Sequence, residues 1–146
     1  MKAVMLSIRP QWAEKIVNGE KTIEVRKSRP AIETPFKCYI YMTQGKFQDL
    51  GTYSDWIYKR RMSVIGEFVC DKIQDNFKYL VTPKGLECAC LTDNELNNYL
   101  GNKGGYGWHI SDLKIYDKPR ELSGFRVERK IDIGWDIPTV VLTRPP

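Results

Sequence analysis

The sequence lacks several patterns that identify common classes of enzyme. It has a single histidine, His109, and no CxxC pair among its four cysteines, so no group of residues has the spacing of a typical zinc site. A Walker phosphate-binding loop and a nucleophile elbow are also missing from it. We therefore expect a function that needs neither a metal ion nor a cofactor.

Long hydrophobic runs are missing too. No apolar stretch approaches the roughly 20 residues that a membrane-spanning helix requires. The opening "MKAVMLSIRP" is too short for a signal peptide and is interrupted by Arg9 and Pro10. These features predict a cytoplasmic protein with no membrane partner.

The cysteines are expected to be reduced. Cys38 and Cys70 lie in apolar, strand-like segments, where a cysteine usually serves as a small hydrophobic residue. Cys88 and Cys90 form a close pair without a second pair or a histidine nearby, and a redox or metal role for them is the weaker alternative.

Composition favours one folded domain with an uneven charge. The 146 residues suit a single hydrophobic core, and 42% of them are hydrophobic. The net charge of +5 is concentrated in residues 1–61, which hold 12 Lys or Arg against 6 Asp or Glu. A local basic surface favours polyanions such as nucleic acid, although a generic basic surface explains the charge equally well.

The spacing of apolar residues predicts a series of short elements. Strands are predicted at 3–8, 21–27, 37–42, 62–73 and 106–116, with a last strand in 137–146. Helices are predicted at 10–19, where Pro10 suits the first turn, and at 92–101, where Thr92 and Glu95 form a capping-box pattern. Residues 44–61 fit either a short helix or an irregular excursion. The pattern predicts a small α+β fold around a curled sheet.

The segment "GEKTIEVRK", residues 19–27, alternates apolar with polar residues and contains several charged side chains. Ile23 and Val25 alternate with Thr22, Glu24 and Arg26, which is the period of a half-buried strand. We expect the two aliphatic side chains to be buried and the three polar ones to line a cleft.

Lys21 has the opposite parity to Glu24, so it joins the polar face only if it lies on the turn after Gly19. Lys21 offers a compact charge for a phosphate, and Arg26 offers a planar fork that grips a phosphate or stacks on a base. Glu24 can accept a hydrogen bond from an exocyclic amine such as that of cytosine. The alternative is that Glu24 and Arg26 simply pair on an exposed strand face.

The segment "LSIRPQWAEKIVNGEKTIEVRK" resembles the opening of an ASCH domain, a member of the PUA-like superfamily. The hallmark of that family is a helix followed by G-x-K-x-x-E-x-R entering a strand, and Gly19, Lys21, Glu24 and Arg26 fill its four positions. The later segments "VIGEFVCDKI", "LTDNELNNYLG" and "GYGWHISDLKIY" also resemble that family, so the similarity covers roughly residues 1–120.

The resemblance implies a PUA-like fold for a single domain spanning residues 1–146: a small β-barrel or a strongly curled mixed sheet flanked by short helices. It implies a cleft beside the motif and a role in binding RNA or a modified nucleotide. Some relatives are amidohydrolases or ribonucleases, so a small metal-independent hydrolase acting on acylated nucleosides or RNA is the alternative. The amidohydrolases use the motif lysine, a threonine three residues later and a separate glutamate. Here Lys21 and Glu24 would be the catalytic residues, and the threonine stands instead at Thr22.

Further ligand contacts are predicted outside the motif. Arg9 precedes the first helix, and an aromatic and basic patch lies outside any clear core pattern and is formed by Trp56, Tyr58, Lys59, Arg60 and Arg61. Aromatic rings beside basic residues are typical of surfaces that bind single-stranded nucleic acid. Trp12 and Trp108 are instead predicted to pack in the core, and His109 to lie on a polar strand face.

Overall fold

The structure is a computed structural model that describes residues 2–129 and 139–143. The strands are β1 (Lys2–Ile8), β2 (Ile23–Arg26), β3 (Phe36–Met42), β4 (Ser63–Asp75), β5 (Tyr106–Arg120), β6 (Phe125–Arg129) and β7 (Thr139–Thr143). The helices are α1 (Pro10–Val17), α2 (Asp55–Arg60), α3 (Phe77–Leu80), α4 (Pro83–Ala89) and α5 (Asp93–Leu100), with 3-10 turns η1 (Phe47–Thr52) and η2 (Leu122–Gly124).

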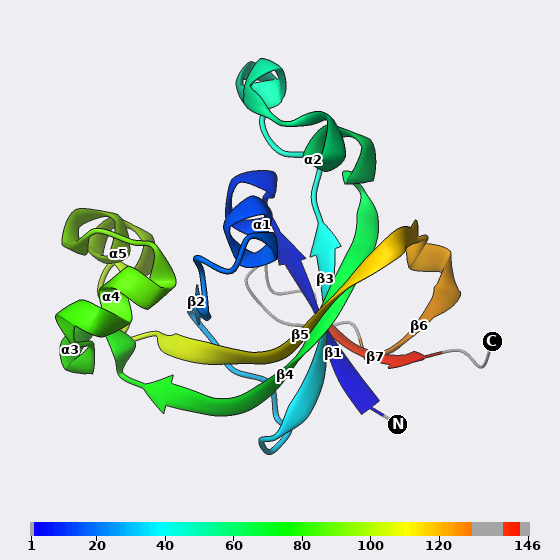
Figure 1. Cartoon of the computed structure of the whole chain (residues 1–146). Coiled ribbons are helices and arrows are strands. Elements are labelled where there is room, and N and C mark those ends of the chain that lie inside the picture. The colour runs from blue at the N-terminus through cyan, green and yellow to red at the C-terminus, as the bar shows by residue number, and fades with distance from the viewer. Residues whose placement is uncertain (1, 130–138, 144–146) are drawn as a thin grey trace.

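These strands form one mixed sheet in the order β2-β5-β4-β3-β1-β7-β6. β1 and β3 pair in parallel, while the other neighbours pair antiparallel. The sheet curls strongly, and Figure 1 shows the long paired strands β4 and β5 running side by side across the molecule. The predicted α+β fold with a strongly curled mixed sheet and flanking helices is confirmed.

Local sequence signals place several elements where they were predicted. Pro10 occupies the first turn of α1, where its missing N–H is not needed. Thr92 and Glu95 form the reciprocal capping box that starts α5. Gly66 lies at a register shift between β4 and β5, where an added Cβ would lie 2.5 Å from the Lys114 carbonyl oxygen. Glycine is therefore required by close backbone approach at this point.

Other elements differ from the prediction. Residues 44–61 contain η1 and the short helix α2, whose N-cap Ser54 accepts a hydrogen bond from the Ile57 amide. Two further helices, α3 and α4, precede α5 and were not predicted. β5 also runs on to Arg120 rather than ending at residue 116, because its second half pairs with the first half of β4.

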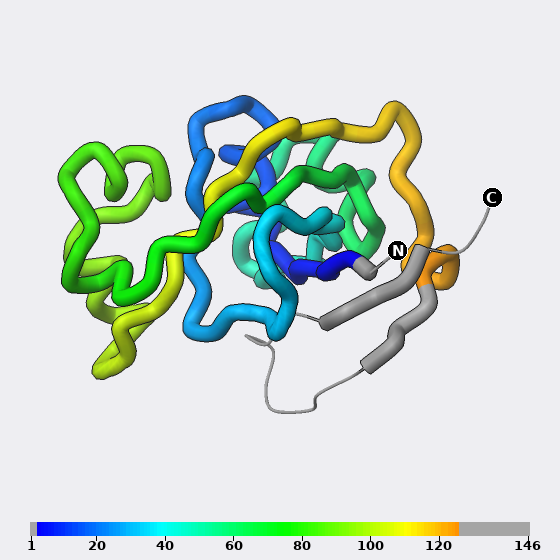
Figure 2. Tube along the Cα trace, turned by 90° about the horizontal axis from the view of Figure 1, so that it is seen from below, coloured from blue at the N-terminus to red at the C-terminus, as the bar shows by residue number. Residues whose placement is uncertain are grey.

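The two faces of the sheet have different coverings. The interior of the curl holds the main core, to which α1 contributes Ala13 and Ile16. Beside β2, helices α3 to α5 form a separate apolar cluster with Val25, and Figures 1 and 2 both show these helices gathered at one end of the molecule. β2 consequently lies between the main core and this helical cluster. Within 2–129 and 139–143, no helix has the length and apolar character to cross a membrane.

Candidate functional site

The motif residues are positioned by the pairing of β2 with β5. In this antiparallel register Glu24 lies opposite Trp108 and Arg26 lies opposite Tyr106. Directly opposed residues project from the same face, so Glu24 and Arg26 point to the interior side with Trp108. Val25 points the other way, into the cluster with α3 to α5.

Lys21 reaches the same place from outside the strand. Gly19, with φ of +84°, turns the chain after α1, and the Lys21 amide donates to the Lys15 carbonyl at 2.9 Å. The Lys21 ammonium donates to the Ala89 carbonyl at the end of α4 at 2.5 Å and lies 3.6 Å from Glu24 Oε1. Its Nζ is also 5.0 Å from the centroid of the Trp12 ring. Lys21 therefore lies on the turn after Gly19, as convergence of the three polar residues required.

Lys21, Glu24 and Arg26 form a buried triad. Their exposed fractions are only 3%, 8% and 6%, so the structure places the ionic pair in the interior rather than on an exposed strand face. Arg26 Nε lies 3.3 Å from Glu24 Oε2, and Arg26 Nη2 donates to the Ser7 carbonyl of β1 at 2.7 Å. The triad thus links α4, β2 and β1. Of the predicted alternation, Val25 is buried and Ile23 is only half-buried.

Burial dominates the electrostatics of Lys21. Removal of the ammonium from water lowers the pKa of Lys21 below its usual value, and the nearby Glu24 carboxylate partly opposes that effect. Both ion pairs of Glu24 are longer than a charge-assisted hydrogen bond of about 2.8 Å. The carboxylate is therefore buried between two cations that it does not hold tightly.

One buried donor beside the triad has no acceptor within the described residues. The indole Nε1 of Trp108, a residue with no exposed surface, makes no hydrogen bond there. Arg26 Nε also makes no hydrogen bond in the described part of the chain, although it is ion-paired with Glu24. A buried donor without an acceptor costs about 1–3 kcal/mol. The main core therefore carries unused hydrogen-bonding capacity directly beside the Glu24 carboxylate.

Thr22 and Arg9 both make backbone hydrogen bonds that shape the surroundings of the triad. The Thr22 amide donates to the Cys88 carbonyl at 2.8 Å, and its carbonyl accepts from the Ile110 amide at 2.9 Å, which ties α4 to β5. The Thr22 side chain is half-buried next to the triad. Arg9 is an exposed residue whose carbonyl starts helix α1.

The aromatic and basic patch lies apart from the triad, on α2 at the far end of β3 and β4 (Figure 1). The Arg60 guanidinium stacks on Trp56 at 4.1 Å, and that of Arg61 stacks on Tyr58 at 4.2 Å. Arg60 and Arg61 also donate to backbone carbonyls, those of Trp56 and Gln44 respectively. Lys59 completes the patch as an exposed residue. The structure thus divides the predicted contacts between two separate regions.

Sequence reasoning missed several residues that surround the triad. Ser7 and Ala89 contribute only carbonyl oxygens, for which no side-chain signal exists. Trp108 was predicted as core, and it is core, but its unpartnered indole N–H depends on a cross-strand register that the sequence does not reveal. Cys38 and Cys70 are buried in the main core, as predicted.

Comparison with known proteins addresses the opening part of the chain and the fold. The family model for the ASCH domain matches residues 6–37, which include α1, β2 and the complete G-x-K-x-x-E-x-R motif. The fold also matches that of ASCH from Zymomonas mobilis, with a TM-score of 0.62. The opening of this chain therefore resembles the ASCH domain, and its fold resembles that of a solved ASCH protein.

Three solved ASCH structures from Zymomonas mobilis share the fold at low identity. The first is 22% identical, and the match covers 83% of this chain and 74% of that one. A variant of that protein with phenylalanine in place of one tyrosine gives 24% identity and a TM-score of 0.61 over 84% and 78% of the two chains. Another variant, with alanine in place of one serine, gives 21% identity and a TM-score of 0.62 over 83% and 75%. No curated protein sequence matches this chain.

Proposed function

We propose that this protein binds RNA or a modified nucleotide, and that the buried triad recognises the ligand. The observation that carries the proposal is the unpartnered donor Trp108 Nε1 beside the Glu24 carboxylate, whose ion pair with Arg26 Nε is not a hydrogen bond. Ordinary interiors satisfy more than about 90% of their buried polar groups, and exceptions concentrate where a ligand or water completes the network.

The chemistry of the triad suits the polar edge of a nucleobase. A base such as cytosine carries a carbonyl oxygen, which accepts from donors like Trp108 Nε1, and an exocyclic amine, which donates to a carboxylate like Glu24. Lys21 and Arg26 add positive charge for an anionic ligand. A base read in this way has to be unpaired, which favours single-stranded RNA or a free nucleotide over a duplex.

A binding screen with charge-neutral substitutions tests this proposal. Purified protein is titrated with the four ribonucleosides, N4-acetylcytidine and short single-stranded RNAs, and binding is followed by calorimetry. Glu24→Gln keeps the size of the side chain but replaces one acceptor by a donor, so we expect a changed preference among bases. Glu67→Gln on the opposite face of the sheet is the matched control and is expected to leave the preference unchanged. Identical base preferences in Glu24→Gln and the parent would reject the proposed role of the triad.

Hydrolysis of acylated nucleosides or RNA is the second candidate function. The observation that favours it is the lowered pKa of Lys21, because perturbed ionisation is frequent at catalytic sites. Glu24 would take a proton from the attacking water, and Lys21 would stabilise the negative charge that develops on the carbonyl oxygen. We rank this function second, because a glutamate occupies the position of the threonine in the amidohydrolase pattern.

Turnover separates the two candidates. Lys21→Ala is expected to reduce ligand affinity in a protein that has no deacylase activity to lose. Release of acetate from N4-acetylcytidine is measured for the parent and for Lys21→Ala. Efficient release that disappears in Lys21→Ala would make hydrolysis the primary function and binding a step within it.

A further inference from the structure

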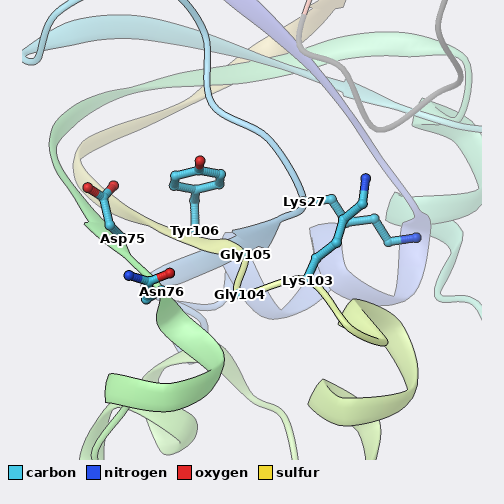
Figure 3. A pocket seen from close by; sticks show the side chains of 7 residues that line it. All are labelled: Lys27, Asp75, Asn76, Lys103, Gly104, Gly105 and Tyr106. Atoms are coloured by element: carbon cyan, nitrogen blue, oxygen red, sulfur yellow. The ribbon is translucent and has the colours of Figure 1, made fainter.

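A polar pocket of about 390 Å³ lies at the end of β2, outside the motif. Its lining comes from the end of β2, the junction of β4 with α3 and the residues that lead into β5 (Figure 3). This volume lies within the range of about 300–1,000 Å³ that is typical of small-ligand sites.

Strand register connects this pocket to the buried triad. Arg26 lies opposite Tyr106 across β2 and β5, and Tyr106 lies opposite Asp75 across β5 and β4. The three side chains therefore form a row on one face of the sheet, next to the row that contains Glu24 and Trp108. Tyr106 packs partly against the main core and also lines the pocket, so it separates the triad from the open space.

Positive charge lies on one side of the pocket. Lys27 and Lys103 project on the same side of Tyr106, while Asp75 and Asn76 lie on the other side (Figure 3). Lys27 Nζ lies 5.0 Å from the Tyr99 ring centroid, which helps to fix its position. The Asp75 carboxylate is paired with Arg29 at 3.3 Å, so the negative charge of the lining is already compensated.

Two glycines expose backbone in the same pocket. Gly104 and Gly105 accept hydrogen bonds at their carbonyls from the Lys78 and Phe77 amides. Their own N–H groups take part in no hydrogen bond within residues 2–129 and 139–143. An added Cβ would lie 2.8 Å from Asn76 Oδ1 at Gly104 and 2.5 Å from Leu100 Cδ2 at Gly105, so close packing requires glycine at both positions.

We propose that this pocket binds the phosphate of a nucleotide, free or within an RNA strand, with Lys27, Lys103 and the Gly104 and Gly105 amides as the donors. The Tyr106 ring supports the sugar or base, which then points along the row toward Arg26 and Glu24. The inference rests on the proposed function, since it assigns the phosphate to a place beside the base-recognition group.

The test compares ligands with and without the phosphate. Cytidine, cytidine 5′-monophosphate and a four-nucleotide cytidine RNA are titrated by calorimetry at low salt. In the parent protein, the monophosphate is expected to bind about tenfold more tightly than cytidine. In K27Q/K103Q this preference is expected to fall to about onefold, while the affinity for cytidine stays unchanged. K84Q/K118Q removes the same charge from exposed lysines elsewhere and should keep the tenfold preference.

The outcomes separate the pocket from the triad. Equal affinity of the parent for cytidine, its monophosphate and the RNA, or a preference that survives in K27Q/K103Q, overturns the phosphate site and leaves the triad proposal intact. Absence of binding by all three ligands overturns both proposals. A preference seen with the RNA but not with the monophosphate assigns the pocket to an RNA strand, whereas a preference seen with both shows that it accepts free nucleotides.

Discussion

Two charged clusters lie on opposite faces of the same sheet, and they differ in the lengths of their polar contacts. On one face, Glu67 accepts a hydrogen bond from the Tyr116 hydroxyl at 2.9 Å and pairs with Lys37 at 2.8 Å. On the other face, Glu24 is more deeply buried, yet its ion pairs measure 3.6 and 3.3 Å. The Glu67 cluster, which is the more exposed of the two, therefore has the shorter contacts.

This difference indicates which cluster is structural. The Glu67 cluster is satisfied within the chain, and Tyr116 is further covered by Arg120 at 4.0 Å. Beside the buried triad, Trp108 Nε1 has no acceptor within the described residues, which is costly for stability in the free protein. We infer that a bound ligand supplies the missing acceptor and so removes this cost. The Glu67 cluster, in contrast, only holds β3, β4 and β5 together.

The largest expected effect comes from removing the central carboxylate of the triad. Glu24→Ala leaves the Lys21 and Arg26 cations buried without a counter-charge, and breaking a buried pair in this way costs about 3–5 kcal/mol. Urea unfolding followed by tryptophan fluorescence measures the loss. A loss below about 1 kcal/mol, the range of exposed pairs, would mean that water reaches the triad freely.

The α2 patch is expected to show the next largest effect, on affinity rather than stability. Reversing the charge at Lys59, Arg60 and Arg61 should weaken binding of single-stranded RNA about tenfold and to a similar degree for different sequences, because such contacts read phosphates. Affinities measured over a range of salt concentrations should show a shallower dependence for the triple variant. No change in either quantity would remove the patch from the binding surface.

For the Glu67 cluster we expect a smaller, pH-dependent effect on stability. Hydrogen bonds from Lys37 and Tyr116 keep the pKa of Glu67 below its usual value despite partial burial, so the ionised form stabilises the fold. This contribution is present above pH of about 4.5 and is lost as the pH falls through the lowered pKa. Glu67→Gln should cost about 1 kcal/mol at pH 7 and progressively less below pH 4. A pH-independent loss would contradict the assignment.

The smallest expected effect on stability comes from Tyr116→Phe in the Glu67 cluster, which is compared with Trp108→Phe beside the triad. Tyr116→Phe removes a satisfied hydrogen bond and should cost about 1 kcal/mol without changing ligand affinity. Trp108→Phe removes an unpartnered N–H, so its cost in the free protein reflects only lost packing, while ligand affinity should fall. Unfolding and binding measurements on both variants check this crossed pattern. Equal affinities of the two variants for the ligand would contradict the proposed difference between the clusters.

Much of the site region follows from local sequence. The alternation of residues 22–26 predicted β2 and the shared face of Glu24 and Arg26, and Gly19 provided the turn that brings Lys21 to them. Helix α4 was not predicted, although Pro83 is at the helix start and the Thr82 side chain accepts a hydrogen bond from the Gly85 amide. The Ala89 carbonyl at its end was consequently missed as a partner of Lys21.

Non-local features could not be predicted in the same way. The depth of burial of the triad depends on its contacts with α4, which follows β2 in the sequence, and with β1, which precedes β2. The alignment of Glu24 with Trp108 depends on the pairing of β2 with β5, a strand far along the chain, and no local spacing encodes that register. The pocket beside Tyr106 likewise requires segments from three parts of the chain.

Proton–nitrogen NMR spectra of the Trp108 indole and the Arg26 Nε–H test the central claim most directly. The Trp108 signal is identified by its absence in Trp108→Phe, and both signals are followed while single-stranded RNA or cytidine 5′-monophosphate is added. Our account predicts that both signals shift to lower field on saturation, as donors do when they gain an acceptor, while amides beside Glu67 and Tyr116 stay in place. Saturable binding that leaves the Trp108 and Arg26 signals unchanged would contradict it.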